Sequence, residues 1–414
     1  MGNNNNNNNI QKNKKTFKVS LRASLLLLFL CMGAGSLSVW SGLSEEAFVM
    51  RAYAQQSPDF AYSSEVWAEL RNNDLNFDEI DKLVHEYNPT VLKNAVAYKN
   101  QADKTSTDIS NSYYDSASQI LNNIQYPDPE SSNYASSVSS YLNSQISYEN
   151  MMEKGDTNTN DSETYKLGYD KTEAQLVKTA KALMVSYWSQ YYTLQTLKDD
   201  ITSAENDLSS VILKISAGSA TESQKLTAEQ KLQSARASLN TAEAKLASTK
   251  EELCLMLGWG YGEEVNIGSL PEITRETVDA IDLNADIETA KANNYTLRST
   301  EKQLANARTE AVISELTVTR DTAVKNIEAD ITDLYSALCQ SLTSLESASD
   351  SLSSSAASLA AARRKSEAGM MTAKDLASAE SSYRSAETNL KTKQCSLVNA
   401  YINYKAAVDG LAET

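Results

Sequence analysis

The sequence predicts an all-α protein built from elongated antiparallel coiled-coil hairpins in two tandem repeats, with little or no β-structure. Three observations support this fold class. The 414 residues include only 5 Pro, 13 Gly and 5 Phe, whereas Ala, Ser, Leu and long polar residues dominate the last two thirds, which is typical of long amphipathic helices. Apolar residues recur there at spacings of three and four. The second half of the chain also repeats part of the first half.

Residues 1–54 are predicted to be a low-complexity N-terminus followed by an export signal. Seven Asn follow Met1-Gly2, and five Lys or Arg precede the apolar run Leu25–Cys31. A basic segment before a short apolar run is typical of a secretory signal. Ala52-Tyr53-Ala54 has the form of a cleavage site. We expect an exported protein of the cell envelope or cell surface. The alternative is that this segment stays uncleaved and anchors the chain in a membrane.

The charge of the chain excludes one class of partner. Without residues 1–54, the chain retains 32 Lys or Arg and 52 Asp or Glu, a net charge of −20. Nucleic acid is polyanionic and is bound mainly through basic side chains. We therefore expect no nucleic-acid partner.

A shift of 151 residues superposes two segments of the chain. Between residues 208–246 and 359–397, 12 of 39 ungapped positions are identical. The shared Ala-Gly-x-x-Thr, at residues 217–221 and 368–372, is harder to obtain from Ala and Ser bias alone. Internal self-similarity of this kind indicates a true structural repeat.

A second correspondence has a different offset. The segment that starts at Asn88 resembles the one that starts at Asn294, 206 residues later. The first repeat therefore has about 55 extra residues, which we assign to a Ser-, Asn- and Tyr-rich insert near residues 110–166. The predicted organisation is given by three ranges: a first repeat at 55–260, a linker at 261–281 and a second repeat at 282–414.

Each repeat is expected to contain a helical hairpin. Residues such as Leu194, Leu197 and Ile201 continue an a/d heptad seam. Gly218 and Gly369 can adopt the left-handed conformation that ends a helix. Thr three residues later, followed by a polar side chain, fits the cap that begins the next helix. The expected caps are Thr221 with Gln224 and Thr372 with Asp375.

The order of these motifs resembles the outer-membrane efflux (TolC-like) family over residues 77–411. Each unit has an early Asn-containing segment, a long helix and a Gly-containing turn, and the first closes with Leu255-Met256-Leu257-Gly258. The resemblance implies a homotrimer whose helices form a hollow cylinder and whose tips meet a membrane-fusion adaptor coupled to a pump. By position, the adaptor-contact residues would be Ala217, Gly218, Ser219, Ala368, Gly369 and Met370.

One feature departs from that family. The resemblance implies that each repeat gives a β-hairpin to an outer-membrane barrel. Residues 305–335 contain no Gly or Pro, and residues 134–148 lack the alternating apolarity of a membrane strand. We therefore expect two TolC-like repeats without the β-barrel hairpins. The insert is expected to be a polar helix or an irregular loop.

The sequence contains no recognisable catalytic or cofactor site. His85 is the single histidine, which excludes His-based triads and clusters of histidine metal ligands. Cys254, Cys339 and Cys395 have no metal-type spacing. We expect no enzyme, no metal and no cofactor. The favoured function is an export conduit subunit that works with an adaptor and a pump. The alternative is a cell-surface coiled-coil scaffold without a channel.

Overall fold

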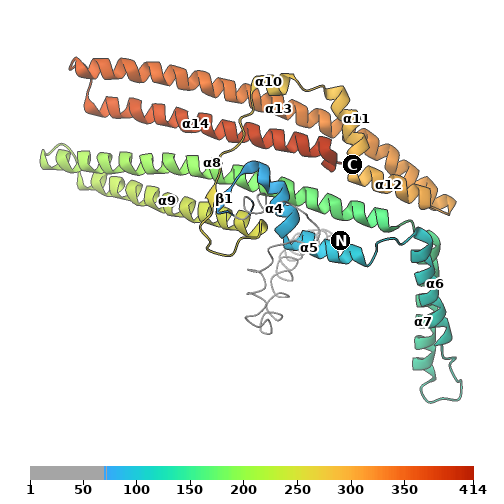
Figure 1. The fold of residues 1–414 in the computed structure, drawn as a ribbon. Helices are drawn as coiled ribbons and strands as arrows, with labels where there is room; N and C mark the ends of the chain where they lie inside the picture. The colour runs from blue at the N-terminus through green and yellow to red at the C-terminus, as the bar shows by residue number, and fades with distance from the viewer. Residues whose placement is uncertain (1–69, 71) are drawn as a thin grey trace, which may run out of the picture. The chain divides into compact units, whose positions relative to one another are not determined.

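The computed structural model describes residues 70 and 72–414, which are almost entirely helical (Figure 1). They belong to one of the two units into which the chain divides, Ser64–Thr414. The predicted export signal, its alternative role as an anchor and the start of the first repeat at residue 55 lie outside the described residues.

Four long helices form two hairpins. They are α8 (Ser162–Ser216), α9 (Glu222–Met256), α13 (Glu310–Glu367) and α14 (Ala373–Ala406). At 1.5 Å per residue, the 55 residues of α8 and the 58 of α13 correspond to about 80 and 87 Å. The apolar seam that includes Leu194, Leu197 and Ile201 is buried or half-buried throughout. The prediction of long antiparallel helix pairs is confirmed.

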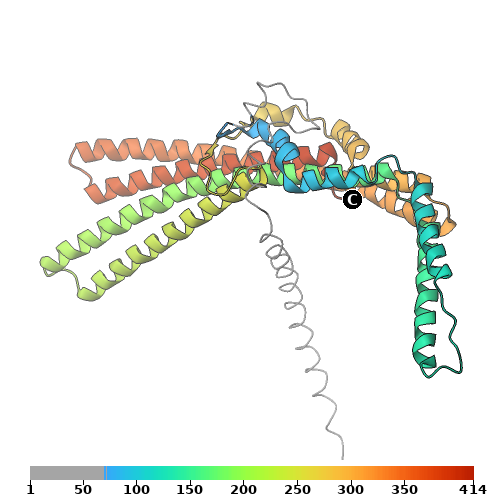
Figure 2. The same ribbon diagram turned by 60° about the horizontal axis from the view of Figure 1, so that its bottom comes forward.

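The long helices lie side by side in the order α9, α8, α14 and α13 (Figures 1 and 2). Within each hairpin the helices are antiparallel, and α14 also runs antiparallel to α8. Asp207 of α8 is 4.0 Å from Lys374 of α14, and Asp199 accepts a 2.8 Å hydrogen bond from Arg384. Because Asp207 and Lys374 lie 11 and 5 residues from Gly218 and Gly369, the two hairpin tips are at the same end of the layer. Helices α9 and α13 form its two edges.

Shorter elements cover the other end of the long helices. In chain order they are β1 (Asp74–Leu75), η1 (Phe77–Glu79), α4 (Ile80–Tyr87), α5 (Pro89–Lys99), β2 (Asn266–Ile267), α10 (Arg275–Asp279), α11 (Leu283–Asn293), α12 (Tyr295–Asn306) and η2 (Ala407–Leu411). Strands β1 and β2 pair in parallel, with Asp74 opposite Asn266 and Leu75 opposite Ile267. These four residues are the only β-structure in the described part of the chain, as expected for a fold with little β.

Each repeat is closed by a buried asparagine in the same position. Asn88 caps α5, where its Oδ1 accepts from the N–H of Thr90, while its Nδ2 donates to the carbonyl of Met256 at 3.0 Å. Asn294 caps α12 in the same way and donates to the carbonyl of Ala412 at 2.9 Å. One amide group thus ties the start of a short helix to the end of its repeat.

A glycine with positive φ lies beside each of these asparagines. Gly258 has φ +89° and packs on Tyr87, the residue before Asn88. Gly410 has φ +122°, and a Cβ there would lie 2.6 Å from the carbonyl oxygen of Asn293. Neither position has room for a side chain, and both have a backbone conformation that favours glycine. The close approach allows the chain end to reach the asparagine.

The core of the second repeat is formed where α11, α12, α13 and η2 meet. Ile327, Ile331, Leu338 and Tyr404 are completely buried there. The Tyr404 hydroxyl donates a 2.7 Å hydrogen bond to Asp286 of α11. Burial, and then this hydrogen bond, raise the pKa of Tyr404 above its ordinary value. A separate cluster that includes Val185 of α8 and Val398 of α14 joins the two repeats.

The predicted insert forms a further helical hairpin in the first repeat, shorter than the α8–α9 hairpin. Helix α6 (Ser106–Asn122) and helix α7 (Tyr134–Thr157) pack against each other. At the corresponding place in the second repeat, residues 307–309 alone connect α12 to α13. The extra residues of the first repeat are therefore helical, and neither location holds strands in the described structure.

Local hydrogen bonds define two further boundaries. The first long helix begins at Ser162, because Asp161 and Thr164 form a capping box there. The predicted linker at 261–281 contains β2 and α10. Thr274 caps α10, and Arg275 pairs with Glu346 of α13. That segment is thereby bound to the second repeat.

Replacement of Asn294 by alanine should destabilise the protein strongly. Asn294→Ala removes the acceptor of two backbone N–H groups, those of Thr296 and Leu297, and the donor to Ala412. Since these groups are buried, the expected loss is about 2–4 kcal/mol of unfolding free energy. Denaturant unfolding followed by circular dichroism measures it. Asn240→Ala, at an exposed position of α9, is the matched control and should change stability by less than about 0.5 kcal/mol. Equal effects of the two changes would contradict the role of Asn294.

Candidate functional site

The two hairpin tips have the same backbone geometry. Gly218 and Gly369 both have φ +70°. The N–H of Gly218 donates to Ile215 at 2.9 Å, and the N–H of Ser219 donates to Lys214 at 2.8 Å. In the second tip, Gly369 and Met370 make the equivalent bonds to Ser366 at 2.9 Å and Lys365 at 2.8 Å. This is the Schellman arrangement, in which a left-handed residue satisfies the last carbonyl groups of a helix.

The helix that follows each tip begins at a threonine cap. Thr221 and Gln224 form a reciprocal capping box: the N–H of Gln224 donates to the Thr221 hydroxyl at 3.3 Å, and Gln224 Oε1 accepts from the Thr221 N–H at 2.8 Å. Thr372 accepts from the N–H of Asp375 at 3.1 Å and donates its hydroxyl proton to the Asp375 carboxylate at 2.7 Å. Both turns are therefore fixed by local hydrogen bonds.

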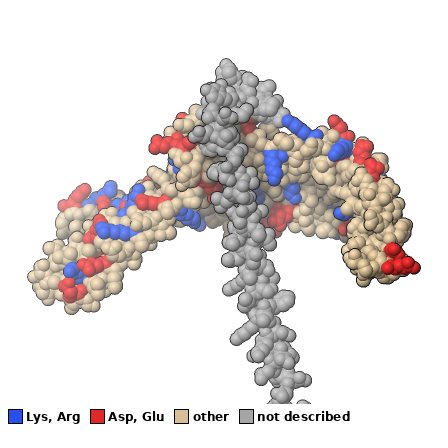
Figure 3. All heavy atoms as spheres, turned by 90° about the horizontal axis from the view of Figure 1, so that it is seen from below, with Lys and Arg blue, Asp and Glu red and all other residues tan. Residues whose placement is uncertain are grey.

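The tip residues themselves lie in solvent. Ala217, Ser219 and Ala368 are exposed, and Met370 is 74% exposed. Apart from the adjacent residues, no atom lies within 4 Å of the place that a Cβ would take on Gly218 or Gly369. Charged side chains of both signs surround the tip of the α8–α9 hairpin, at the left of Figure 3. Each turn is therefore held by local hydrogen bonds and presents its outer residues to solvent.

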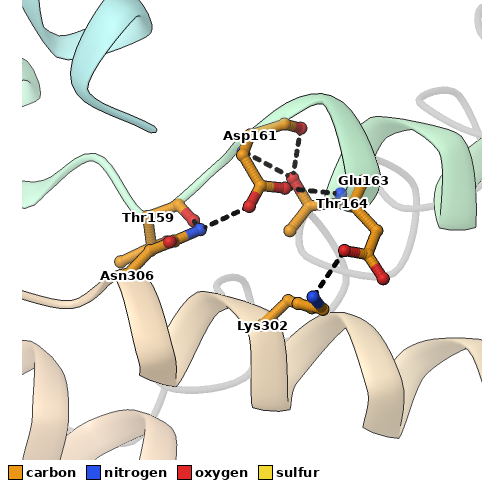
Figure 4. Close-up of polar contacts among 6 residues, drawn as sticks. All are labelled: Thr159, Asp161, Glu163, Thr164, Lys302 and Asn306. Atoms are coloured by element: carbon orange, nitrogen blue, oxygen red, sulfur yellow. Dashed lines mark hydrogen bonds and ion pairs between the residues drawn. The ribbon is translucent and has the colours of Figure 1, made fainter. Parts of the chain in front are cut away.

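A second polar site joins the two repeats at the far end of α8 (Figure 4). Asn306, the last residue of α12, donates through Nδ2 to the carbonyl of Thr159 at 3.0 Å and to the carboxylate of Asp161 at 2.8 Å. Lys302, one turn earlier, lies 2.5 Å from Glu163. Asp161 is also the cap of α8. The end of α12, in the second repeat, therefore holds the start of the long helix of the first repeat.

The α6–α7 hairpin is fastened to this junction at its base. Asn158 is buried and donates through Nδ2 to the carbonyl of Ser106 at 3.0 Å. Gly155 packs directly on the ring of Tyr114, and the Tyr114 hydroxyl donates to Asp156 at 2.8 Å. A hydrogen bond from Asn158 to its own neighbour, the carbonyl of Asn160 at 3.2 Å, continues the network toward α8.

Four asparagines thus make hydrogen bonds that link distant parts of the chain, and the sequence alone did not predict these roles. They are Asn88, Asn158, Asn294 and Asn306. For Asn88 and Asn294 a signal existed, because both stand at the start of the duplicated segment 206 residues apart. Asn158 has no comparable signal, because it lies in the insert that the repeats do not share. Asn306 lies at the end of the shared segment, but its partners at residues 159 and 161 adjoin the insert and have no counterpart in the other repeat.

The single histidine and two of the cysteines, residue types often used in catalysis, are paired or buried. His85 pairs with Glu173 of α8. Cys254 and Cys395 are buried, and burial raises the pKa of each thiol to about 11. In the described part of the chain, no three His, Cys, Asp or Glu side chains are grouped so as to hold a metal ion. No described helix has the length and apolarity that a membrane-spanning helix requires.

A cavity of about 800 Å³ lies between the repeats, lined by residues of α4, α8, α12 and α14. Its wall contains the ion pairs Lys166–Asp170 at 2.7 Å and Lys181–Asp81 at 2.6 Å. It lies against the first third of α8, away from both tips.

Comparison with known proteins identifies the fold. No family model and no curated protein sequence matches the chain. The solved structure of the Campylobacter jejuni CmeC outer membrane channel matches with a TM-score of 0.54 at 10% identity, over 86% of this chain and 90% of that one. The outer-membrane channel OprN matches with a TM-score of 0.52 at 11% identity, over 87% and 95%. The chain has a TolC-like fold.

A membrane protein from Pseudomonas aeruginosa shares this TolC-like fold, with a TM-score of 0.50 at 12% identity over 81% of this chain and 90% of that one. The resemblance recognised in the sequence is confirmed at the level of the fold. CmeC and OprN are channels, and a TolC-like fold agrees with the prediction that the chain is not an enzyme.

Alanine at either tip glycine should cost stability through the backbone alone. The left-handed φ of +70° is unfavourable for a residue with a Cβ, and there is open space around it. Gly218→Ala and Gly369→Ala should each lower the unfolding free energy by about 1 kcal/mol. Denaturant titration measures this value. Gly218→Asn should cost less, since asparagine tolerates this conformation. A stabilising effect of alanine would contradict the capping geometry.

Loss of Asn306 should loosen the junction without unfolding the long helices. Asn306→Ala removes two hydrogen bonds that hold residues 159–161. Hydrogen exchange should rise at the start of α8 and at the base of α6 and α7, with a cost of about 1–2 kcal/mol. Asn111→Ala, at an exposed position of α6, is the control. Unchanged exchange in Asn306→Ala would show that the hairpin base is held by other contacts.

Proposed function

We propose that the protein is a subunit of a TolC-like export conduit that works with a membrane-fusion adaptor and a pump of the inner or plasma membrane. The fold supports this proposal, because the TolC-like match spans 86% of the chain and 90% of a known outer membrane channel. The exported location expected from the sequence, in the cell envelope or at the cell surface, agrees with such a role.

The observation that carries the proposal is the pair of equivalent tips. Both tips have a left-handed glycine, the same two helix-ending hydrogen bonds and exposed outer residues, and both lie at one end of the layer. A partner that recognises one tip finds the same backbone surface at the other. We assign the adaptor contact to Ala217, Gly218, Ser219, Ala368, Gly369 and Met370.

The arrangement of the long helices supports a closed homo-oligomer. Helices α9 and α13 form the edges of the layer, and each packs within its own chain on a single long helix. If the α13 edge of one copy packs on the α9 edge of the next, the same contact repeats around the assembly. A head-to-tail contact of this kind gives a ring when the rotation closes. We propose a homotrimer in which the helices enclose the conduit.

Transport through such a conduit is passive, and the pump supplies the energy. Without residues 1–54 the chain contains 52 Asp or Glu against 32 Lys or Arg, and we propose on this basis that the lumen is acidic. An acidic wall favours the passage of cations and neutral molecules over anions.

The oligomeric state tests the proposal. Size exclusion with light scattering should give about three times the mass of the processed chain, and electron microscopy of that species should show a hollow particle. Ser219→Asp combined with Met370→Asp should leave the trimer intact and prevent its complex with a membrane-fusion adaptor, because the added carboxylates are placed at the tips alone. Ser139→Asp, on exposed α7, is the matched control. A monomeric rod that binds no adaptor would favour the cell-surface scaffold instead.

A further inference from the structure

The tips have a charge opposite to that of the rest of the chain. The two fifteen-residue tip segments, 211–225 and 362–376, together contain six Lys or Arg and three Asp or Glu. The remaining 384 residues contain 32 Lys or Arg and 51 Asp or Glu. A local basic surface on an acidic protein attracts partners that the rest of the protein repels.

The basic side chains of the tips differ in their surroundings. Arg363 lies 3.5 Å from Glu380 within its own hairpin, and Lys374 lies 4.0 Å from Asp207 of α8. Arg364 and Lys365 are exposed and form no ion pair within the described structure. Their position in the last turn of α13 also suits the negative end of the helix dipole, but that interaction leaves their N–H groups open to solvent.

An exposed apolar side chain lies in the same tip as these cations. Met370, in the turn that follows Arg364 and Lys365, is 74% exposed. The first tip also has exposed apolar side chains, Leu213 and Leu226, which are 70% and 56% exposed. Large apolar groups beside unpaired cations are typical of a protein contact surface, where an apolar centre supplies affinity and charges at its rim supply selectivity.

We infer that the basic tip of the α13–α14 hairpin, through Arg364 and Lys365, recognises a protein segment in which carboxylates flank an apolar side chain. This inference rests on the proposed function and specifies the adaptor: its contact end is acidic. An anionic membrane surface fits less well, because Glu222, Glu367 and Asp375 lie at the same end. A uniformly negative surface would repel these carboxylates, whereas a discrete partner can avoid them.

The test uses the full chain and three synthetic helical peptides. The peptides share one apolar stripe, and the flanking positions are all Glu, all Gln or all Lys. Fluorescence anisotropy at low salt should show that the Glu peptide binds about tenfold more tightly than the Gln peptide, with the difference falling at high salt. Arg364→Glu with Lys365→Glu should abolish this preference.

Lys198→Glu with Lys245→Glu is the matched control, because it makes the same change of net charge on exposed positions of α8 and α9 away from the tips. It should leave the preference for the Glu peptide within twofold of the wild type. A loss of preference in this control as well would overturn the inference, since it would show that only the net charge matters.

Two further measurements separate this inference from the proposed function. Binding to vesicles of phosphatidylglycerol and phosphatidylcholine without a preference for the Glu peptide would replace the acidic protein with an anionic membrane and overturn the inference. A trimer that binds the Glu and Gln peptides equally would overturn the inference and keep the conduit. A monomer that binds the Glu peptide through Arg364 and Lys365 would keep the inferred acidic recognition and overturn the conduit.

Discussion

The fold depends on one interaction made twice, the amide bridge of Asn88 and Asn294. Each side chain must accept from a backbone N–H at the start of a short helix and donate to a carbonyl 168 or 118 residues away. Asparagine does both with one short planar group, whereas aspartate cannot donate when ionised and serine is too short. The bridge fixes where each repeat begins relative to where it ends, at the end of the layer opposite the tips.

The sequence predicted the features that depend on local pattern. Heptad spacing around Leu194 predicted the buried seam, and the duplicated Gly218 and Gly369 marked the turns. The α6–α7 hairpin was harder to predict, because Ser and Asn have weak helix propensity. Its helices are fixed instead by the Thr105–Asp108 capping box and by the close contact of Gly155 with Tyr114. Such a contact between residues 41 positions apart leaves no periodic signal.

The sequence predicts where the candidate site lies but not which of its basic side chains are paired. Repeat matching placed Met370 and Ser219 at equivalent tips from sequence alone. Which cations are available at those tips depends on contacts across the fold. Lys374 pairs with Asp207 of α8, in the other repeat, and Arg363 pairs with Glu380 of α14. Arg364, next to Arg363 in the chain, points to solvent because successive residues on a helix face different directions. The packing of the hairpins therefore decides which of these two neighbouring arginines has an acidic partner.

The inequality of the two repeats has a consequence for symmetry. At the tips the repeats are equivalent, with the same turn at Gly218 and Gly369. At the other end they differ, since α6 and α7 occupy one repeat and residues 307–309 the other. A closed assembly of n chains therefore presents 2n nearly equivalent positions at the tip end and only n helical projections at the opposite end. The tip end of such an assembly therefore has approximate 2n-fold rotational symmetry, whereas the opposite end has n-fold symmetry. A partner with 2n-fold symmetry can match the assembly only at the tips.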